Sequence, residues 1–341
     1  MASANDRPRA QLYVFDGSVW ASVPRIGLVE KGYSPSDLDI KQVNLLKGEN
    51  FAPSYLRLNP NGTVPTLVVP TSDTTSEEVA TKFRAITDSK QILAFLDESR
   101  SQHILEAKGQ GKDAAAPVLS PATIEGKALS DSLIALVHGS DLDPNFLLLS
   151  ARTLEEVKPL KEGIAGVFVN GQVAALKRYQ AQVQADSNQT SNPDANPRSA
   201  AHNEQLLKWY TDKLHALSPA YHVYGPESTQ QATQLFIQLS RSRWQKLGAA
   251  LAQLERQIRG PYALGDQVSL ADAHLMAWFA RVIAVCESKE SAKDLDALEK
   301  ALQHEAVAGE GRSMLGPKVR AYWQALKSRP SFQAVYKDGL H

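Results

Sequence analysis

NPNGTVPTL, residues 59–67, is the most informative stretch of this chain, and Asp88-Ser89 follows it after a polar interval. Proline lowers the cost of a cis peptide bond, so the chain can turn sharply at Val64-Pro65 and leave the Val64 N–H and C=O outside any sheet. A free donor and acceptor of this kind can pair with another backbone, as in strand addition. The alternative is that NPNG is only a polar turn and Val64-Pro65 begins an edge strand. Either way, the stretch predicts a turn that leads into a strand.

Short apolar runs and helical patterns alternate around this turn. We predict strands at 11–15, 38–44, 64–69 and 83–86, and helices at 23–31 and 89–96. Their order is βαβ followed by ββα, which predicts an α/β domain. The polar Ser/Thr/Glu-rich stretch at 70–81 is predicted to be an extended hairpin loop between the last two strands.

Beyond Asp97 the pattern changes to helices only. We therefore predict a first domain at 1–99, a linker at 100–117 and an all-helical domain at 118–341. Helices are expected at 121–138, 167–185, 244–258 and 273–286, with a mixed segment at 141–162. The stretch 187–198, SNQTSNPDANPR, is rich enough in Asn, Pro and Ser to predict disorder.

Two of these helices carry stronger signals. Ser269-Leu270-Ala271-Asp272 predicts a capping box, with an acidic residue at the third helical position, ahead of the apolar helix at 273–286. In the helix at 244–258, the apolar positions keep to one face: Leu247, Leu251, Leu254 and Ile258.

Composition limits the possible partners. The 341 residues are 43% hydrophobic and 22% charged, as in an ordinary globular protein. Lys and Arg number 37, as do Asp and Glu, so no net field attracts nucleic acid or an anionic membrane. The longest apolar run, 276–286, contains Arg281 and is too short to span a bilayer. We expect neither a nucleic-acid nor a membrane partner.

The N-terminus, MASANDRPRAQ, is polar and lacks the apolar core of a secretory signal, which predicts a cytoplasmic protein. The single cysteine, Cys286, excludes an internal disulfide and a CxxC redox centre, and its apolar neighbours predict a buried side chain. Eight histidines show no metal-ligand spacing. His138, Asp141 and Asp143 are interpreted as a helix end and turn, so no metal site is predicted.

Four segments, taken in order, resemble the glutathione transferase family. They are LYVFDGSVWASVPRIGLVEKGY at 12–33, NLLKGENFAPSYLRLNPNGTVPTL at 44–67, AITDSKQILAFLDE at 85–98 and LERQIRGPYALGDQVSLADAHLMAWFARV at 254–282. The match is good over 10–98 and 244–286 and poor between 100 and 240. The resemblance implies an α/β thioredoxin-like N-terminal domain that holds glutathione, an all-α C-terminal domain, and a large insertion around 140–235.

The resemblance also assigns the glutathione site. It implies that Val64, before cis Pro65, pairs with the cysteinyl unit, and that Asp88 and Ser89 hold the γ-glutamyl end. The chemistry agrees, since a carboxylate suits an ammonium group and a helix N-terminus suits a carboxylate. The alternative is that Asp88-Ser89 only cap a helix. Lys47 and Asn50 lie in the loop that would hold the glycyl carboxylate, although Lys47 can equally be a solvated surface charge.

Catalysis in this family requires a thiolate, which a hydroxyl hydrogen bond and a helix dipole can stabilise. Counting back from Arg25, Ser18 falls at the position of the catalytic serine of the serine-type classes; the alternative is an idle loop serine. Ser22 is a rival, because Pro24 favours the first turn of a helix and Ser22 is a good N-cap. Trp20 is expected to wall the pocket, to donate a hydrogen bond or to pack beneath the loop.

The resemblance therefore implies a serine-type glutathione transferase, cytoplasmic and homodimeric, that acts in detoxification. Its thiolate would attack an apolar electrophile, by conjugation or by ether cleavage. One alternative is a non-catalytic ligand-binding protein of the same fold, and another is an interaction module. The poorly matched helical segment concentrates aromatic residues that either wall an acceptor pocket or pack in a core: Trp209, Tyr210, Tyr221, His222 and Tyr224.

Overall fold

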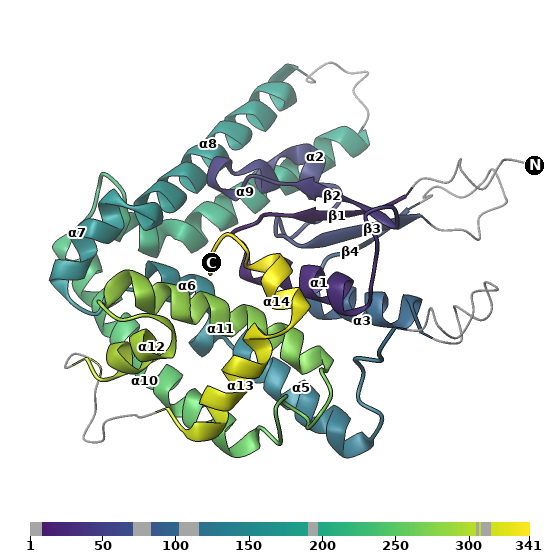
Figure 1. Ribbon diagram of the computed structural model, residues 1–341. Coiled ribbons are helices and arrows are strands. Elements are labelled where there is room, and N and C mark those ends of the chain that lie inside the picture. Colours follow the sequence, from purple (N-terminus) through teal and green to yellow (C-terminus); the bar gives the residue numbers. More distant parts are fainter. Residues whose placement is uncertain (1–8, 71–82, 102–115, 190–196, 305–306, 308–314) are drawn as a thin grey trace, which may run out of the picture. The chain divides into compact units, whose positions relative to one another are not determined.

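The computed structural model describes residues 9–70, 83–101, 116–189, 197–304, 307 and 315–341 (Figure 1). It divides into two compact units, described separately below. The sheet unit comprises segments 1–42, 64–148 and 242–341, and the hairpin unit comprises 43–63 and 149–241.

The sheet unit contains a four-stranded sheet in the order β2-β1-β3-β4. Its strands are β1 (Ala10–Val14), β2 (Leu38–Gln42), β3 (Thr66–Pro70) and β4 (Phe83–Ile86). β2 runs parallel to β1, with Ala10 opposite Leu38, whereas β3 is antiparallel to both β1 and β4. The predicted order of elements is confirmed, and β4 has the bounds predicted for it.

Helix α1 (Val19–Glu30) begins earlier than predicted. The sequence favoured a start at Ser22 or Val23 because of Pro24, and this was wrong. Ser18 caps the helix and Pro24 lies inside it. Val19, Val23 and Ile26 recur at helical spacing and are all buried in the core. Burial of this extra turn outweighs the backbone hydrogen bond that proline cannot make.

Helix α11 (Leu270–Lys289) of the sheet unit is buried along most of its length. Asp272 and Ser269 form the predicted capping box at its start. Cys286 is fully buried, as predicted. The other helices are α3 (Ser89–Ser99), α5 (Ile124–His138), η5 (Ser140–Leu142), α12 (Asp294–Leu302), α13 (Pro317–Lys327) and α14 (Pro330–Val335), with the later part of α10 (Gln230–Gln257) and most of α6 (Pro144–Leu149).

The hairpin unit is built on two long helices, α8 (Ile164–Gln189) and α9 (Pro197–Tyr224), which pack along each other (Figure 1). Its core includes Phe51, Leu176, Val183, Leu206 and Tyr210. The shorter elements are η2 (Leu45–Lys47), η3 (Glu49–Phe51), α2 (Pro53–Leu56) and α7 (Leu154–Glu162). The loop after β2 therefore belongs to the same compact unit as the insertion.

Three predicted connecting segments lie largely outside the described residues: the hairpin loop at 70–81, the linker at 100–117 and the disordered stretch at 187–198. Where 187–198 is described, the backbone is helical, at the end of α8 and the start of α9. The domain boundaries at 99 and 118 stay a prediction. None of the described helices combines the length and apolar character needed to cross a bilayer.

Candidate functional site

Three predicted site segments meet at one edge of the sheet. Ser18 follows the C-terminal end of β1, Val64-Pro65 precedes β3, and Asp88-Ser89 follows β4. β3 is antiparallel to both neighbours, with Tyr13 opposite Thr66 and Leu67 opposite Ile86. The end of β1, the start of β3 and the end of β4 therefore lie at the same edge. Sheet topology brings together segments that are distant in sequence.

Ser18 is the N-cap of α1 and is half-buried. Its Oγ accepts a hydrogen bond from the backbone N–H of Ala21 at 3.4 Å. Accepting this bond leaves the hydroxyl proton available for donation to another group. Ser18 thus lies at the positive end of the helix dipole, and its hydroxyl can donate a hydrogen bond.

Ser22 has a different environment, since it is fully buried. Its backbone N–H and its Oγ both donate to the carbonyl of Ser18, at 3.1 and 3.2 Å. The same Oγ lies 3.2 Å from Nε2 of His341, whose ring packs against Tyr336 with centroids 4.9 Å apart. These contacts make Ser22 a support for the loop that carries Ser18.

Arg281 of α11 also holds this loop. Its Nη2 donates to the carbonyl of Gly17 at 2.6 Å. Burial lowers the pKa of Arg281 to about 10, so the guanidinium stays charged at neutral pH. In the sequence, Arg281 is recognisable only as an interruption of an apolar run. A lone arginine in an otherwise apolar helix could have indicated a specific hydrogen-bond partner, because buried charges almost always have one.

Trp20 packs on a pair of histidines. Its ring stacks on His138 with centroids 3.8 Å apart and planes inclined by 17°. Nε2 of His138 lies 2.9 Å from Nδ1 of His274, so one ring donates and the other accepts. His138 ends α5, as predicted. No group of three metal-ligating side chains occurs in the described part of the chain.

We expect the histidine pair to make folding sensitive to mild acid. Burial lowers the pKa of His138 to about 4, with Lys90 lowering it further and Asp88 opposing, and lowers the pKa of His274 well below its ordinary value. In the unfolded state, histidine has a pKa of about 6.5. From that pH down to about 4, the unfolded state binds more protons than the folded state, so the stability of the fold decreases as the pH is lowered. Thermal midpoints across this range should drop less in His138→Asn than in the wild type. Parallel curves for the two proteins would contradict this.

The Val64-Pro65 peptide bond is cis, as the resemblance implied. Val64 lies outside β3, and its N–H and C=O make no backbone hydrogen bond to any described residue. Asp88 caps α3, with Oδ1 accepting from the N–H groups of Lys90 and Gln91 at 3.0 and 3.1 Å. Ser89 begins the helix and is buried. The capping role of Asp88 is thus observed, and a ligand-binding role stays a prediction.

Lys47 and Asn50 lie in the hairpin unit. Lys47 is exposed, whereas Asn50 is buried and its Nδ2 donates to the carbonyl of Gly62 at 2.7 Å. Gly62 has a φ of +61°, a conformation that favours glycine in the NPNG turn. Asn59 closes the turn by donating to the carbonyl of Thr63 at 2.7 Å. Asn50 thus holds the turn with one of its amide protons.

The aromatic residues of α9 serve mainly as core. Tyr210 and Tyr224 are buried, and the Tyr210 hydroxyl donates to the carbonyl of Phe51 at 2.7 Å. Burial raises the pKa of each of these two tyrosines well above the ordinary value for tyrosine. Of the two predicted alternatives, core packing is the one observed for these two residues.

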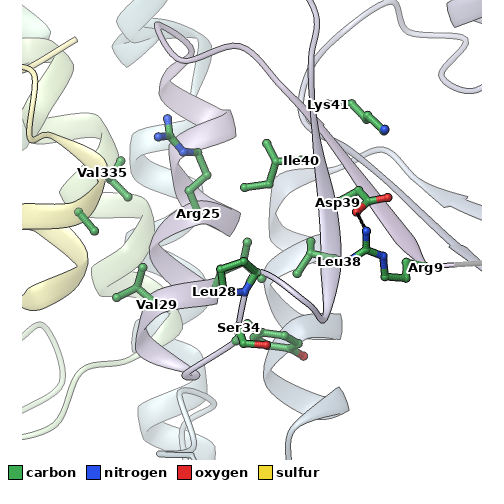
Figure 2. A pocket seen from close by; sticks show the side chains of 13 residues that line it. Arg9, Arg25, Leu28, Val29, Ser34, Leu38, Asp39, Ile40, Lys41 and Val335 are labelled. Atoms are coloured by element: carbon green, nitrogen blue, oxygen red, sulfur yellow. Dashed lines mark ion pairs between the residues drawn. The ribbon is translucent and has the colours of Figure 1, made fainter. Parts of the chain in front are cut away.

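A cavity of about 640 Å³ lies elsewhere in the sheet unit, between α1, β2 and α14 (Figure 2). Arg25, Ile40 and Val335 are among its lining residues, and Arg9 pairs there with Asp39 at 2.6 Å. None of the predicted site residues lines it. The cavity is therefore separate from the edge that carries Ser18.

These observations define the fold class, which is the predicted one: a thioredoxin-like sheet and a mostly helical remainder. Residues 12–103 match the family model for the N-terminal domain of glutathione S-transferases. The crystal structure of the beta-etherase LigF from Sphingobium sp. strain SYK-6 has the same fold, with a TM-score of 0.53 at 17% identity, covering 97% of this chain and 100% of that one.

Curated relatives match part of the chain. A zeta-class glutathione S-transferase from Euphorbia esula is 34% identical over 135 residues, 40% of this chain and 47% of that protein. Maleylacetoacetate isomerase maiA from Aspergillus fumigatus is 37% identical over 115 residues, 33% of this chain and 45% of that protein. The chain thus spans less than half the length of these relatives. Together with the domain match, they show that the chain is similar to glutathione S-transferases, most clearly over residues 12–103.

Proposed function

We propose that this protein is a serine-type glutathione transferase in which Ser18 helps to ionise the thiol of bound glutathione. The observation that carries the proposal is the convergence of Ser18, Val64 and Asp88 at one edge of the sheet. The match of residues 12–103 to the N-terminal domain of glutathione S-transferases supports glutathione as the co-substrate.

Each end of glutathione has candidate partners. Val64 offers its backbone N–H and C=O to the cysteinyl unit. Asp88 offers its carboxylate to the γ-glutamyl ammonium, and the N-terminus of α3 at Ser89 favours the carboxylate of that end. Lys47 and Asn50 belong to the loop for the glycyl carboxylate. Trp20, held by its stack on His138, walls the site beside Ser18.

The chemistry is stabilisation of a thiolate. A free thiol titrates near ~8.5, and lowering its pKa by about two units requires roughly 2.7 kcal/mol. The Ser18 hydroxyl donates a hydrogen bond to sulfur, and the α1 N-terminus supplies a positive dipole. Arg281 fixes the carbonyl of Gly17, so the loop is positioned before glutathione binds. The thiolate then attacks an electrophilic, apolar second substrate.

The reaction is conjugation or glutathione-dependent ether cleavage, both of which start from the same thiolate. We propose that the protein acts in detoxification, in the cytoplasm and as a homodimer. The competing function is a glutathione-transferase-like binding protein without turnover, which needs the glutathione contacts but no thiolate stabiliser.

Ultraviolet difference titration with glutathione across pH tests the proposal, because thiolate absorbs where thiol does not. We expect saturable binding and a bound-thiol pKa well below the free value. Binding with an unshifted pKa would instead support the binding protein. No binding at any pH would overturn both. S-methylglutathione, which has no thiol to ionise, is the control for absorbance changes of the protein itself.

A further inference from the structure

The cavity between α1, β2 and α14 has no part in the proposed function (Figure 2). All of its lining residues belong to the sheet unit. Its volume of about 640 Å³ falls within the range of roughly 300 to 1,000 Å³ that is usual for pockets that bind small organic molecules. The cavity is therefore large enough for a ligand of its own.

Apolar side chains form much of the cavity wall. Leu28 and Leu38 are buried, whereas Val29 is exposed and Ile40 is 51% exposed. Figure 2 shows Ile40 directed from β2 toward α1. Covering exposed aliphatic groups of this kind removes apolar surface from water. The wall thus favours a ligand with a hydrocarbon part.

The charges around the cavity favour an anion. Three cations line it, Arg9, Arg25 and Lys41, against one carboxylate, Asp39. Asp39 pairs with Arg9 at 2.6 Å, so the charges of Arg25 and Lys41 are not balanced within the lining. A ligand with one negative group complements this excess of positive charge.

Arg25 is the cation best placed to hold such a group. Its side chain is only 20% exposed, and its Nη1 lies 3.1 Å from Oδ1 of Asp16, whose side chain is 66% exposed. Nη1 is buried and forms no hydrogen bond of normal geometry with any described residue. The same Asp16 oxygen also accepts from Nε2 of Gln42 at 3.1 Å. A guanidinium this deeply buried gains from a carboxylate that satisfies its donors more fully.

We propose that this cavity is a second binding site, for a small amphipathic carboxylate whose head group pairs with Arg25 in place of Asp16. The hydrocarbon part of the ligand covers Ile40 and Val29. Asp16 lies in the loop between β1 and α1 that also carries Ser18, so the ligand and this loop compete for Arg25. The inference does not depend on glutathione binding.

Isothermal titration calorimetry of the full chain with octanoate tests the proposal, and octanol is the uncharged analogue. We expect saturable octanoate binding that is about tenfold tighter than octanol binding. Arg25→Met, which keeps the aliphatic stem, should weaken octanoate binding about tenfold and change octanol binding by less than about twofold. Asp16→Asn should strengthen octanoate binding about threefold, because it removes the competing partner of Arg25.

Ile40→Glu tests the same site without altering the arginine. It places a carboxylate on the exposed wall and should weaken octanoate binding at least about tenfold. Ile124→Glu is the matched control, since Ile124 is an exposed isoleucine of the sheet unit outside the cavity and its replacement should leave octanoate binding unchanged.

Three results would overturn the inference. The first is that the wild type does not bind octanoate. The second is that Ile40→Glu binds octanoate as tightly as the wild type, which would place the ligand elsewhere. The third is an equal loss of octanoate and octanol binding in Arg25→Met, which would assign Arg25 a structural role.

Discussion

Ser18→Ala is expected to lower turnover by about 10- to 100-fold at neutral pH while changing glutathione affinity by less than about twofold. The hydroxyl stabilises the thiolate and contributes little to holding the peptide backbone, which contacts other residues. Without its donor, the bound thiol reverts toward its free pKa and the ionised fraction falls. Steady-state kinetics with an activated aryl halide, together with glutathione titration, measures both effects.

The serine also caps α1, so the variant needs a control for lost capping. Thr123 caps α5 in the same way, with Oγ1 accepting from the N–H of Gly126 at 3.0 Å. Thr123→Ala should cost about 1 kcal/mol of stability, like Ser18→Ala, and leave turnover intact. Ser22→Ala should also affect stability more than turnover, because Ser22 is fully buried. Loss of turnover in Ser22→Ala alone would reverse the assignment.

Asp272→Ala is expected to reduce the free energy of unfolding by about 3 to 5 kcal/mol. The carboxylate is fully buried and accepts four hydrogen bonds. The donors are the N–H of Ala263 at 2.8 Å, the N–H and Oγ of Ser269 at 2.7 Å each, and the Tyr322 hydroxyl at 2.9 Å. Alanine would leave all four donors without a partner in the core, at the start of α11.

Urea denaturation measures this effect as a lower midpoint with an unchanged slope. Asp266→Ala in the preceding loop is the matched control, since Asp266 is exposed and its removal should cost less than about 0.5 kcal/mol. A loss below about 1 kcal/mol for Asp272→Ala would mean that water satisfies the freed donors and that the capping network contributes little.

Local sequence signals predicted the features that depend on short-range contacts. The NPNG turn forms through Asn59 and the positive φ of Gly62, both within the motif. The capping box likewise joins two residues that are three positions apart, Ser269 and Asp272. In these cases the donor and acceptor are close in sequence, so the residue types alone indicate the bond.

The site was predicted less completely, for the opposite reason. Arg281 reaches Gly17 across 264 positions, and no periodicity links the two residues. The histidine pair beside Trp20 joins α5 to α11. The helix start at Val19 was missed because Pro24 gave a strong local signal that burial of the preceding turn overrode.

Local sequence patterns alone predicted the order of the four strands with helices α1 and α3, the capping box, and the segments that carry Ser18, Val64 and Asp88. Only the tertiary structure decided which distant groups meet. Lys31, fully buried with its Nζ 2.8 Å from Asp97, is one case, and the packing of Trp209 against Gly62 is another. Periodicity and turn chemistry act over a few residues, whereas the choice of a packing partner depends on how complete elements fit together.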